Sequence, residues 1–238
     1  MKTTIFPDNT FVKHMDDEVA EWQRHCLKSR FFNSFDGAEL SARFAVNPES
    51  IGSVIFVHGF TEFTEKYTEM LYYFYNEGYS VFMYDQRGHG HSARFVEEDY
   101  LVHIDTFDTY VKDLDFFISR LVLHETPGGP FYLFAHSMGG CIAALYLEHR
   151  PDFFRKAILS SPMLRMTFGS IPTFAGKAMA TAAKLINREE SPVPAPSLSA
   201  QRLISRQVLR PASRGSCGST ASRSRQAPTR TLRRRMGG

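Results

Sequence analysis

The sequence predicts an α/β fold built on a mostly parallel sheet. Short apolar runs alternate along the chain with longer stretches in which apolar residues recur at helical spacing. The runs are continuous, which is typical of strands covered on both faces. The composition is ordinary for a globular protein, with 43% hydrophobic and 22% charged residues in 238, enough for one sizeable domain. Strands that alternate with helices form parallel sheets.

The first half of the chain supplies four strands and one helix. Residues 28–46 are expected to form two short strands around an Asp-Gly turn, which gives the sheet an antiparallel edge. The apolar runs at 53–57 and 79–84 are expected to be buried strands. Between them, residues 67–77 have helical spacing, and Gly78 is well placed to end that helix.

The second half repeats the cycle. Helix, strand, helix and strand are expected over residues 107–122, 131–135, 138–149 and 157–160. The first of these helices carries one apolar stripe, with Asp105 or Thr106 as its expected N-cap. After Ser161 the pattern changes, and a further helix is expected at about 173–187.

Two parts of the chain carry net charges of opposite sign. Residues 191–238 contain ten arginines and no lysine, aspartate or glutamate, so they carry +10, whereas residues 1–190 carry −7. The arginine-rich segment has no aromatic residue and buries too little apolar surface to offset its ordering entropy, so we expect it to be disordered.

Several classes of protein are disfavoured. No run approaches the roughly 18 apolar residues of a membrane-spanning helix, and the N-terminus turns acidic before any apolar stretch, unlike a secretory signal. Cys26, Cys141 and Cys217 are odd in number and lack metal-ligand spacing, so neither a disulfide scaffold nor a metal site is expected. A cytoplasmic, enzyme-like domain is the better interpretation.

The strongest chemical signal is A-H-S-M-G-G at residues 135–140, between an expected strand and an expected helix. This is the context of a nucleophile elbow, in which a sharp turn exposes Ser137 at the end of the sheet. Positions two before and two after the serine must be small, as Ala135 and Gly139 are. The alternative is a glycine-rich structural turn with an incidental serine.

Two further motifs favour the chemical interpretation. H-G-F at 58–60 follows the first central strand, where the Phe60 N–H is placed to stabilise an oxyanion. Y-D-Q-R-G-H-G-H-S at 84–92 follows the next strand. The three motifs, in this order and spacing, resemble the α/β-hydrolase superfamily, and more narrowly its lysophospholipase and monoacylglycerol lipase branch. The similarity runs from about residue 32 to about residue 186.

The resemblance implies a serine carboxylic-ester hydrolase on an α/β-hydrolase fold, with a doubly wound, mostly parallel sheet and the start of a lid. Ser137 would be the catalytic nucleophile that forms an acyl-enzyme, and the backbone N–H groups of Phe60 and Met138 would form the oxyanion hole. No metal or cofactor is implied. A lysophospholipid or monoacylglycerol is the implied substrate, with a peripheral membrane contact although no amphipathic anchor stands out. A peptide or another ester remains an alternative substrate.

The same resemblance divides the chain and assigns supporting roles. The expected divisions are an N-terminal extension (1–27), the hydrolase core (28–162), the start of the lid (163–190) and the basic tail (191–238). Histidines at the three motifs are expected to shape loops and bind backbone groups, namely His58, His89 and His136. Asp85 and Arg87 are expected to brace the glycine-rich loop through a salt bridge.

The acid and base of a catalytic triad are not identifiable. After Ser137 the only aspartate is Asp152 and the only histidine is His149. His149 lies about 18 Å along the expected helix from Ser137, beyond hydrogen-bonding reach. A catalytically incomplete remnant is therefore the alternative to an active enzyme.

The C-terminal part of the fold is expected to be incomplete. The last two strands of the superfamily's sheet have no counterpart, and an unpaired apolar edge after residue 160 would make the chain poorly soluble. The composition of the tail favours out-of-frame translation or truncation over an evolved segment. A genuine disordered extension that binds phosphates is the rival, but without aromatic residues no specific nucleic-acid binding is expected.

Overall fold

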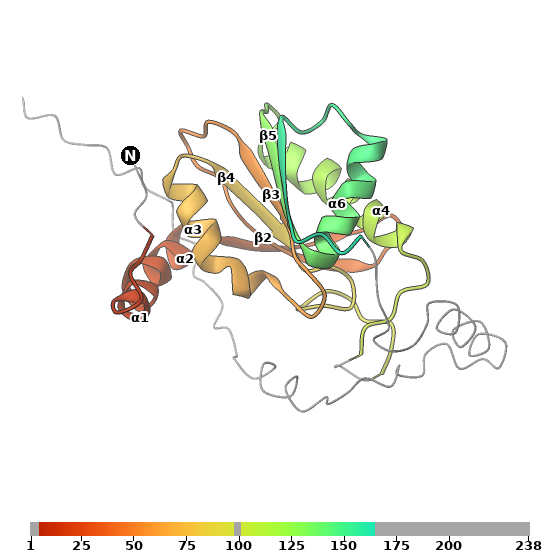
Figure 1. Cartoon of the computed structure of the whole chain (residues 1–238), viewed down its shortest axis with the longest axis horizontal. Helices are drawn as coiled ribbons and strands as arrows, with labels where there is room; N and C mark the ends of the chain where they lie inside the picture. Colours follow the sequence, from red (N-terminus) through yellow and green to blue (C-terminus); the bar gives the residue numbers. More distant parts are fainter. Residues whose placement is uncertain (1–4, 98–100, 165–238) are drawn as a thin grey trace, which may run out of the picture.

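The computed structural model describes residues 5–97 and 101–164, in which six strands form one mixed sheet (Figure 1). The strands are β1 (Lys28–Asn33), β2 (Glu39–Ala45), β3 (Ser53–Val57), β4 (Ser80–Tyr84), β5 (Phe131–His136) and β6 (Lys156–Ser160). Their order across the sheet is β1-β2-β4-β3-β5-β6. The first two pairs are antiparallel and the other three are parallel. The parallel sheet with an antiparallel edge is confirmed.

Helices cover both faces of this sheet. They are α1 (Phe11–His14), α2 (Ala20–His25), α3 (Thr68–Asn76), α4 (Asp108–Phe117), α5 (Leu123–Glu125) and α6 (Ser137–His149). The buried side chains of α4 and α6 belong to one hydrophobic cluster, and those of α2 and α3 belong to a second. Figure 1 shows α3 and α6 in separate groups of helices, with the strands between them. The fold therefore has three layers.

Strand β3 shows how the two clusters share the sheet. All five of its residues are buried. Ile55 and Val57 belong to the cluster that includes α4 and α6, while Val54 and Phe56 belong to the cluster on the opposite face. Because successive side chains of a strand point to opposite faces, a strand buried on both sides is apolar along most of its length, here from Val54 to Val57. This explains the continuous apolar run in the sequence.

Strand β6 has different surroundings. Among the described residues it pairs only with β5, and Ile158 in its centre is 55% exposed. An exposed apolar side chain on an outer strand is a recognised aggregation hazard. The expected low solubility of the chain stays a prediction.

The long helix after β4 differs in detail from its prediction. The helical stretch is α4, a π-helical turn (Ile118–Val122) and α5. Its N-cap is Phe107 and no side chain caps it, so the expected caps, Asp105 and Thr106, were wrong. The backbone carbonyl of Thr106, rather than its hydroxyl, accepts the Thr109 N–H at 3.1 Å.

The N-terminal segment packs onto α3. After α1, a π-helical turn (Met15–Val19) leads into α2, which buries Trp22 against the rings of Tyr72 and Tyr75. The expected helix at 173–187 and the basic tail lie outside the described residues, as does the expected start of the lid apart from Met163 and Leu164.

Candidate active site

The turn between β5 and α6 has the geometry of a nucleophile elbow. β5 ends at His136, α6 begins at Ser137, and Ser137 has a φ of 51°. Such a left-handed conformation is unfavourable for a non-glycine residue and persists only where the surrounding structure imposes it. The predicted strand–serine–helix context is therefore present, with Ser137 in a strained backbone conformation.

Close packing of the elbow against β3 explains the small residues around it. A Cβ atom on Gly139 would clash with the backbone carbonyl oxygens of Val57 and His58. A Cβ atom on Gly59, in the loop that follows β3, would lie 3.0 Å from the Cβ of Ser137. The two glycines thus allow the end of β3, its following loop and the start of α6 to meet.

The two backbone N–H groups expected to bind an oxyanion belong to the start of α6 and to the loop that packs against it. Met138 lies in the first turn of α6, where N–H groups have no partner within the helix. Phe60 follows Gly59 in the loop that packs against Ser137. Neither N–H has a hydrogen-bond partner among residues 5–97 and 101–164. The helix dipole also favours negative charge at this position.

Glu62 connects this loop to the elbow, a role that sequence reasoning missed. Its Oε2 atom accepts hydrogen bonds from the Gly59 N–H at 2.6 Å and from the Tyr67 hydroxyl at 2.8 Å. The same oxygen lies 3.1 Å from Nδ1 of His136. Burial raises the pKa of the Glu62 carboxyl, but the hydrogen bonds from His136, Tyr67 and Gly59 outweigh burial and leave it below its usual value.

His58 shapes the loop and is not available as a base. Its Nδ1–H donates to the Gly59 carbonyl at 2.8 Å, and its Nε2 accepts the Gln86 N–H at 3.0 Å. The side chain is fully buried, and this burial lowers the pKa of His58 to about 4. A neutral imidazole with both nitrogens occupied cannot take a proton from Ser137.

His89 lies beside His58 and is likewise neutral. The two rings are 5.3 Å apart, and the ring of Phe60 packs against the other side of His89. His89 Nδ1 bonds the Arg87 carbonyl at 3.1 Å. Burial, reinforced by His58, lowers the pKa of His89 to about 4. Its role is structural, beneath the loop that carries Phe60.

The expected salt bridge between Asp85 and Arg87 is wrong. Asp85 accepts the backbone N–H groups of Thr64 and His91, at 2.7 and 3.0 Å. Burial raises the pKa of Asp85 above its usual value although these N–H groups oppose the shift. The two residues still brace the loop, but each does so through other partners.

Arg87 extends away from Asp85 toward α4. Its guanidinium binds the fully buried Asp113 at 2.7 Å and the half-exposed Asp36 at 2.9 Å. Burial opposes the charge on Arg87, but the hydrogen bonds to Asp113 and Asp36 outweigh it and raise its pKa. The loop after β4 is therefore tied to a helix 26 residues further along the chain.

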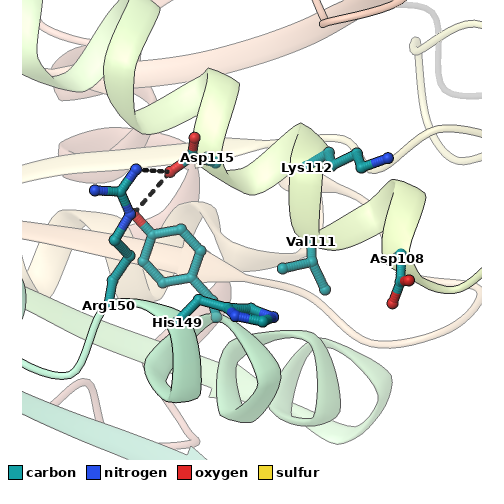
Figure 2. Close-up of a pocket in the computed structure, with 7 residues that line it drawn as sticks. Asp108, Val111, Lys112, Asp115, His149 and Arg150 are labelled. Carbon is teal, nitrogen blue, oxygen red and sulfur yellow. Dashed lines mark hydrogen bonds and ion pairs between the residues drawn. The ribbon is translucent and has the colours of Figure 1, made fainter.

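His149 and Asp152 lie far from Ser137. His149 is the last residue of α6, whose thirteen residues span about 18 Å between it and Ser137. It lines an open cavity of about 310 Å³ between α4 and α6 (Figure 2). Asp152 follows α6 on the exposed surface. Neither is placed to accept a proton from Ser137.

Residues 5–97 and 101–164 contain no cluster of three or more histidine, cysteine, aspartate or glutamate side chains able to hold a metal ion. No helix in these ranges is both long and apolar enough to cross a bilayer.

Comparison with known proteins identifies the family. The chain matches the family described as serine aminopeptidase, S33, over residues 48–215, which is more than half of its length. The chain belongs to this family of α/β-hydrolases. The S33 assignment confirms the expected α/β-hydrolase fold, in which Ser137 occupies the elbow between β5 and α6.

Curated relatives confirm the resemblance to lysophospholipases and monoacylglycerol lipases. The chain is 37% identical over 129 residues to a probable lysophospholipase L2 of Haemophilus influenzae and 34% identical over 124 residues to lysophospholipase L2 of Escherichia coli K12. It is 32% identical over 153 residues to human monoglyceride lipase. These matches cover 52%, 51% and 64% of this chain, but 39%, 35% and 47% of the relatives. The chain thus spans less than half the length of each.

Solved structures support the fold alone. A thermostable carboxyl esterase from Bacillus coagulans has a TM-score of 0.53 and 24% identity, covering 69% of this chain and 51% of that chain. A thioesterase domain from the curacin biosynthetic pathway has a TM-score of 0.53 and 22% identity, covering 69% and 55%.

Proposed function

We propose that this chain carries the nucleophile and oxyanion hole of a serine carboxylic-ester hydrolase. The observation that carries the proposal is the strained backbone of Ser137 at the β5–α6 turn, beside the unpaired N–H groups of Phe60 and Met138. The strained backbone of Ser137 and the unpaired N–H groups both cost free energy, and such costs are typical of functional sites.

The chemistry follows from this arrangement. Oγ of Ser137 attacks the ester carbonyl carbon, and the carbonyl oxygen acquires negative charge between the N–H groups of Phe60 and Met138. The hydroxyl proton of Ser137 passes to solvent, and solvent supplies the proton that the leaving alcohol takes up. Each such donor contributes a few kcal/mol of transition-state stabilisation. Collapse of the tetrahedral intermediate expels the alcohol and leaves an acyl group on Ser137, which water then hydrolyses to a free acid.

The proposed substrate is a glycerol ester with a single acyl chain, either a lysophospholipid or a monoacylglycerol. The relatives named lysophospholipase L2 and monoglyceride lipase support this class. The half-exposed ring of Phe60 offers an apolar surface in the loop that packs against Ser137. Use of such lipids implies a peripheral contact with membranes, which vesicle co-sedimentation tests. A peptide or another ester is the alternative substrate.

A second candidate is a catalytically incomplete protein that binds its ligand without efficient turnover. It is favoured by the positions of His149 and Asp152, because no described residue after Ser137 lies where a general base is needed. A serine hydrolase without its base keeps about 10³-fold catalysis over water from binding and the oxyanion hole. The rate of ester hydrolysis by the wild-type chain therefore distinguishes the two candidates, because an incomplete protein should not exceed this residual level and a complete hydrolase should.

The test compares three proteins on four substrates. Wild type, Ser137→Ala and His149→Ala are assayed with p-nitrophenyl butyrate, a monoacylglycerol, a lysophosphatidylcholine and an aminoacyl amide. We expect Ser137→Ala to reduce ester hydrolysis to the residual rate that binding and the oxyanion hole alone supply. His149→Ala should keep the wild-type rate, because His149 lies about 18 Å from Ser137. Equal rates for wild type and Ser137→Ala would rule out the hydrolase proposal for this chain.

A further inference from the structure

The loop that carries Phe60 contains a second strained residue. Thr61 has a φ of 59°, in the left-handed region that non-glycine residues avoid. Among the described residues only Thr61, Ser137 and Ser161 combine a positive φ with a side chain. Two of these three therefore belong to the site, and the structure around Thr61 must hold its backbone in place.

The Glu62 carboxylate, next to Thr61 in the chain, holds the same loop. Its Oε2 atom gathers the Gly59 N–H, the Tyr67 hydroxyl and His136 Nδ1 within 3.1 Å. These groups come from the loop itself, from the turn that precedes α3 and from the last residue of β5. One oxygen atom thus ties the loop to the residue that precedes Ser137.

The same contacts occupy the backbone groups of Gly59, the residue before Phe60. The Gly59 N–H is occupied by Glu62, and the Gly59 carbonyl accepts bonds from His58 Nδ1 at 2.8 Å and from the Glu62 N–H at 3.4 Å. With both backbone groups of Gly59 held, the Phe60 N–H is the next along the chain and has no partner among the described residues.

We propose that Glu62 is a positioning residue that holds the Phe60 N–H in register with Ser137. The inference rests on the proposed function, because it assigns Phe60 to the oxyanion hole. The role is geometric: a carboxylate close to a developing negative charge repels it, so the charge of Glu62 cannot itself stabilise the oxyanion. An uncharged side chain that accepts the same hydrogen bonds should therefore serve as well.

The first experiment measures binding of phenylboronic acid, which needs no turnover. Its boron forms a bond to Ser137 Oγ, the hydroxyl proton passes to solvent, and the resulting anionic tetrahedral adduct places a boron-bound oxygen in the oxyanion hole. We expect Glu62→Ala to raise the Kd about 10-fold or more, since small misplacements of such donors are costly. Glu62→Gln should stay within about 3-fold, because the amide oxygen accepts the same bonds.

A matched control separates the loop from general effects of losing a carboxylate. Glu69 lies on α3 and accepts the Tyr73 hydroxyl at 2.7 Å, as Glu62 accepts that of Tyr67. Glu69→Ala should leave the Kd of phenylboronic acid unchanged. Glu62→Asp withdraws the carboxylate by one methylene, so its Kd should rise about 3-fold or more. Glu62→Asp takes the place of Glu62→Ala in this test if Glu62→Ala does not fold.

The second experiment observes the loop directly by NMR. In Glu62→Ala the Gly59 amide should exchange its hydrogen at least about 10-fold faster, and the Phe60 amide resonance should move. Both should be restored in Glu62→Gln and unaffected in Glu69→Ala. A merely structural carboxylate would change overall stability without this local, rescuable pattern.

The outcomes separate the two proposals. If wild type and Ser137→Ala bind phenylboronic acid equally, the proposed nucleophile fails, and the Phe60 resonance alone then decides the positioning role. If Ser137 is required but Glu62→Ala changes neither the Kd nor the Phe60 resonance, the positioning role is overturned and the function stands. Equal losses in Glu62→Ala and Glu62→Gln would also overturn it, because they would assign the effect to charge.

Discussion

Two regions of the molecule contain the same residue types in opposite surroundings. One region is the ends of β3, β4 and β5, and the other is the cavity between α4 and α6. His58, at the end of β3, and Asp113, the α4 partner of Arg87 in the loop after β4, are fully buried, and each is held by several hydrogen bonds. In the cavity, Asp115 is 40% exposed and pairs at 3.7 Å with an exposed Arg150 (Figure 2). An acidic residue, a histidine or a tyrosine is therefore not evidence of a site until its burial and partners are known.

Asp113 and Asp115, two residues apart on α4, give the largest expected contrast. Asp113→Ala leaves the buried Arg87 guanidinium with only the half-exposed Asp36, and we expect it to lower the free energy of unfolding by about 3–5 kcal/mol. Asp115→Ala removes a solvent-screened pair and should cost about 1 kcal/mol or less. Urea unfolding followed by the fluorescence of Trp22 measures both. Comparable losses would mean that Arg87 does not depend on Asp113.

The buried histidines predict acid sensitivity. His58 and His89 have pKa values of about 4 because they are buried, below the value of about 6.5 in an unfolded chain. Between these values the unfolded state binds more protons, so the stability present above pH 6.5 is lost as the pH falls toward 4. The expected loss is about 3 kcal/mol for one such histidine.

Histidine variants separate the contribution of the buried histidines to this pH dependence from the contribution of the carboxyl groups. Unfolding free energies are measured from pH 7 to 4.5 for wild type, His89→Gln and His149→Gln. The His89 variant should show a shallower pH dependence than wild type, whereas the variant at the cavity should match wild type. A curve for His89→Gln that parallels wild type would contradict the buried, neutral state of His89.

Close packing at the elbow predicts an intermediate loss of stability when Gly139 is substituted. A Cβ atom on Gly139 clashes with two backbone carbonyl oxygens at the end of β3, which cannot move aside cheaply. We expect Gly139→Ala to lower the free energy of unfolding by about 1–3 kcal/mol. A Cβ on Gly128, in the loop before β5, meets no atom within 4 Å, so Gly128→Ala should stay within about 0.5 kcal/mol of wild type. Calorimetric melting of both variants tests this, and a tolerated Gly139→Ala would contradict the contact with β3.

The sequence predicted the features that depend on local pattern. Strands β3 and β5 were placed to within one residue because a strand covered on both faces is apolar along most of its length. The elbow was recognisable because its glycine and serine spacing reflects a turn between adjacent elements. Ser137 and Phe60 were named from such short motifs and Met138 from the family resemblance that the motifs carry, and their catalytic roles stay predictions.

Contacts between distant segments could not be predicted in the same way. Arg87 binds Asp113, 26 residues away, rather than the nearby Asp85, because the loop turns its side chain toward α4. Glu62 meets His136 across 74 residues. An acidic residue soon after the end of a strand was the only signal for Glu62, and it does not distinguish a connecting carboxylate from a solvated one.

Two tyrosine hydroxyl groups give the smallest contrast, with opposite expected signs. Tyr84 ends β4 between the rings of Phe32 and Phe117, and its buried hydroxyl has no hydrogen-bond partner in the described part of the protein. Tyr146 lines the cavity and donates to Asp115 at 3.3 Å. Both side chains differ from phenylalanine by one oxygen atom, so the two substitutions remove the same group from different surroundings.

Removal of the unpaired hydroxyl relieves a desolvation cost, and we expect Tyr84→Phe to raise the free energy of unfolding by up to about 1 kcal/mol. Tyr146→Phe loses a hydrogen bond and should lower it by about 0.5–1 kcal/mol. Urea midpoints measured side by side resolve differences of this size, provided that the slopes of the two transitions agree. If Tyr84→Phe lowers the free energy of unfolding more than Tyr146→Phe does, the Tyr84 hydroxyl has a hydrogen-bond partner. The hydroxyl at the end of β4 would then be hydrogen-bonded, as the Tyr146 hydroxyl in the cavity is.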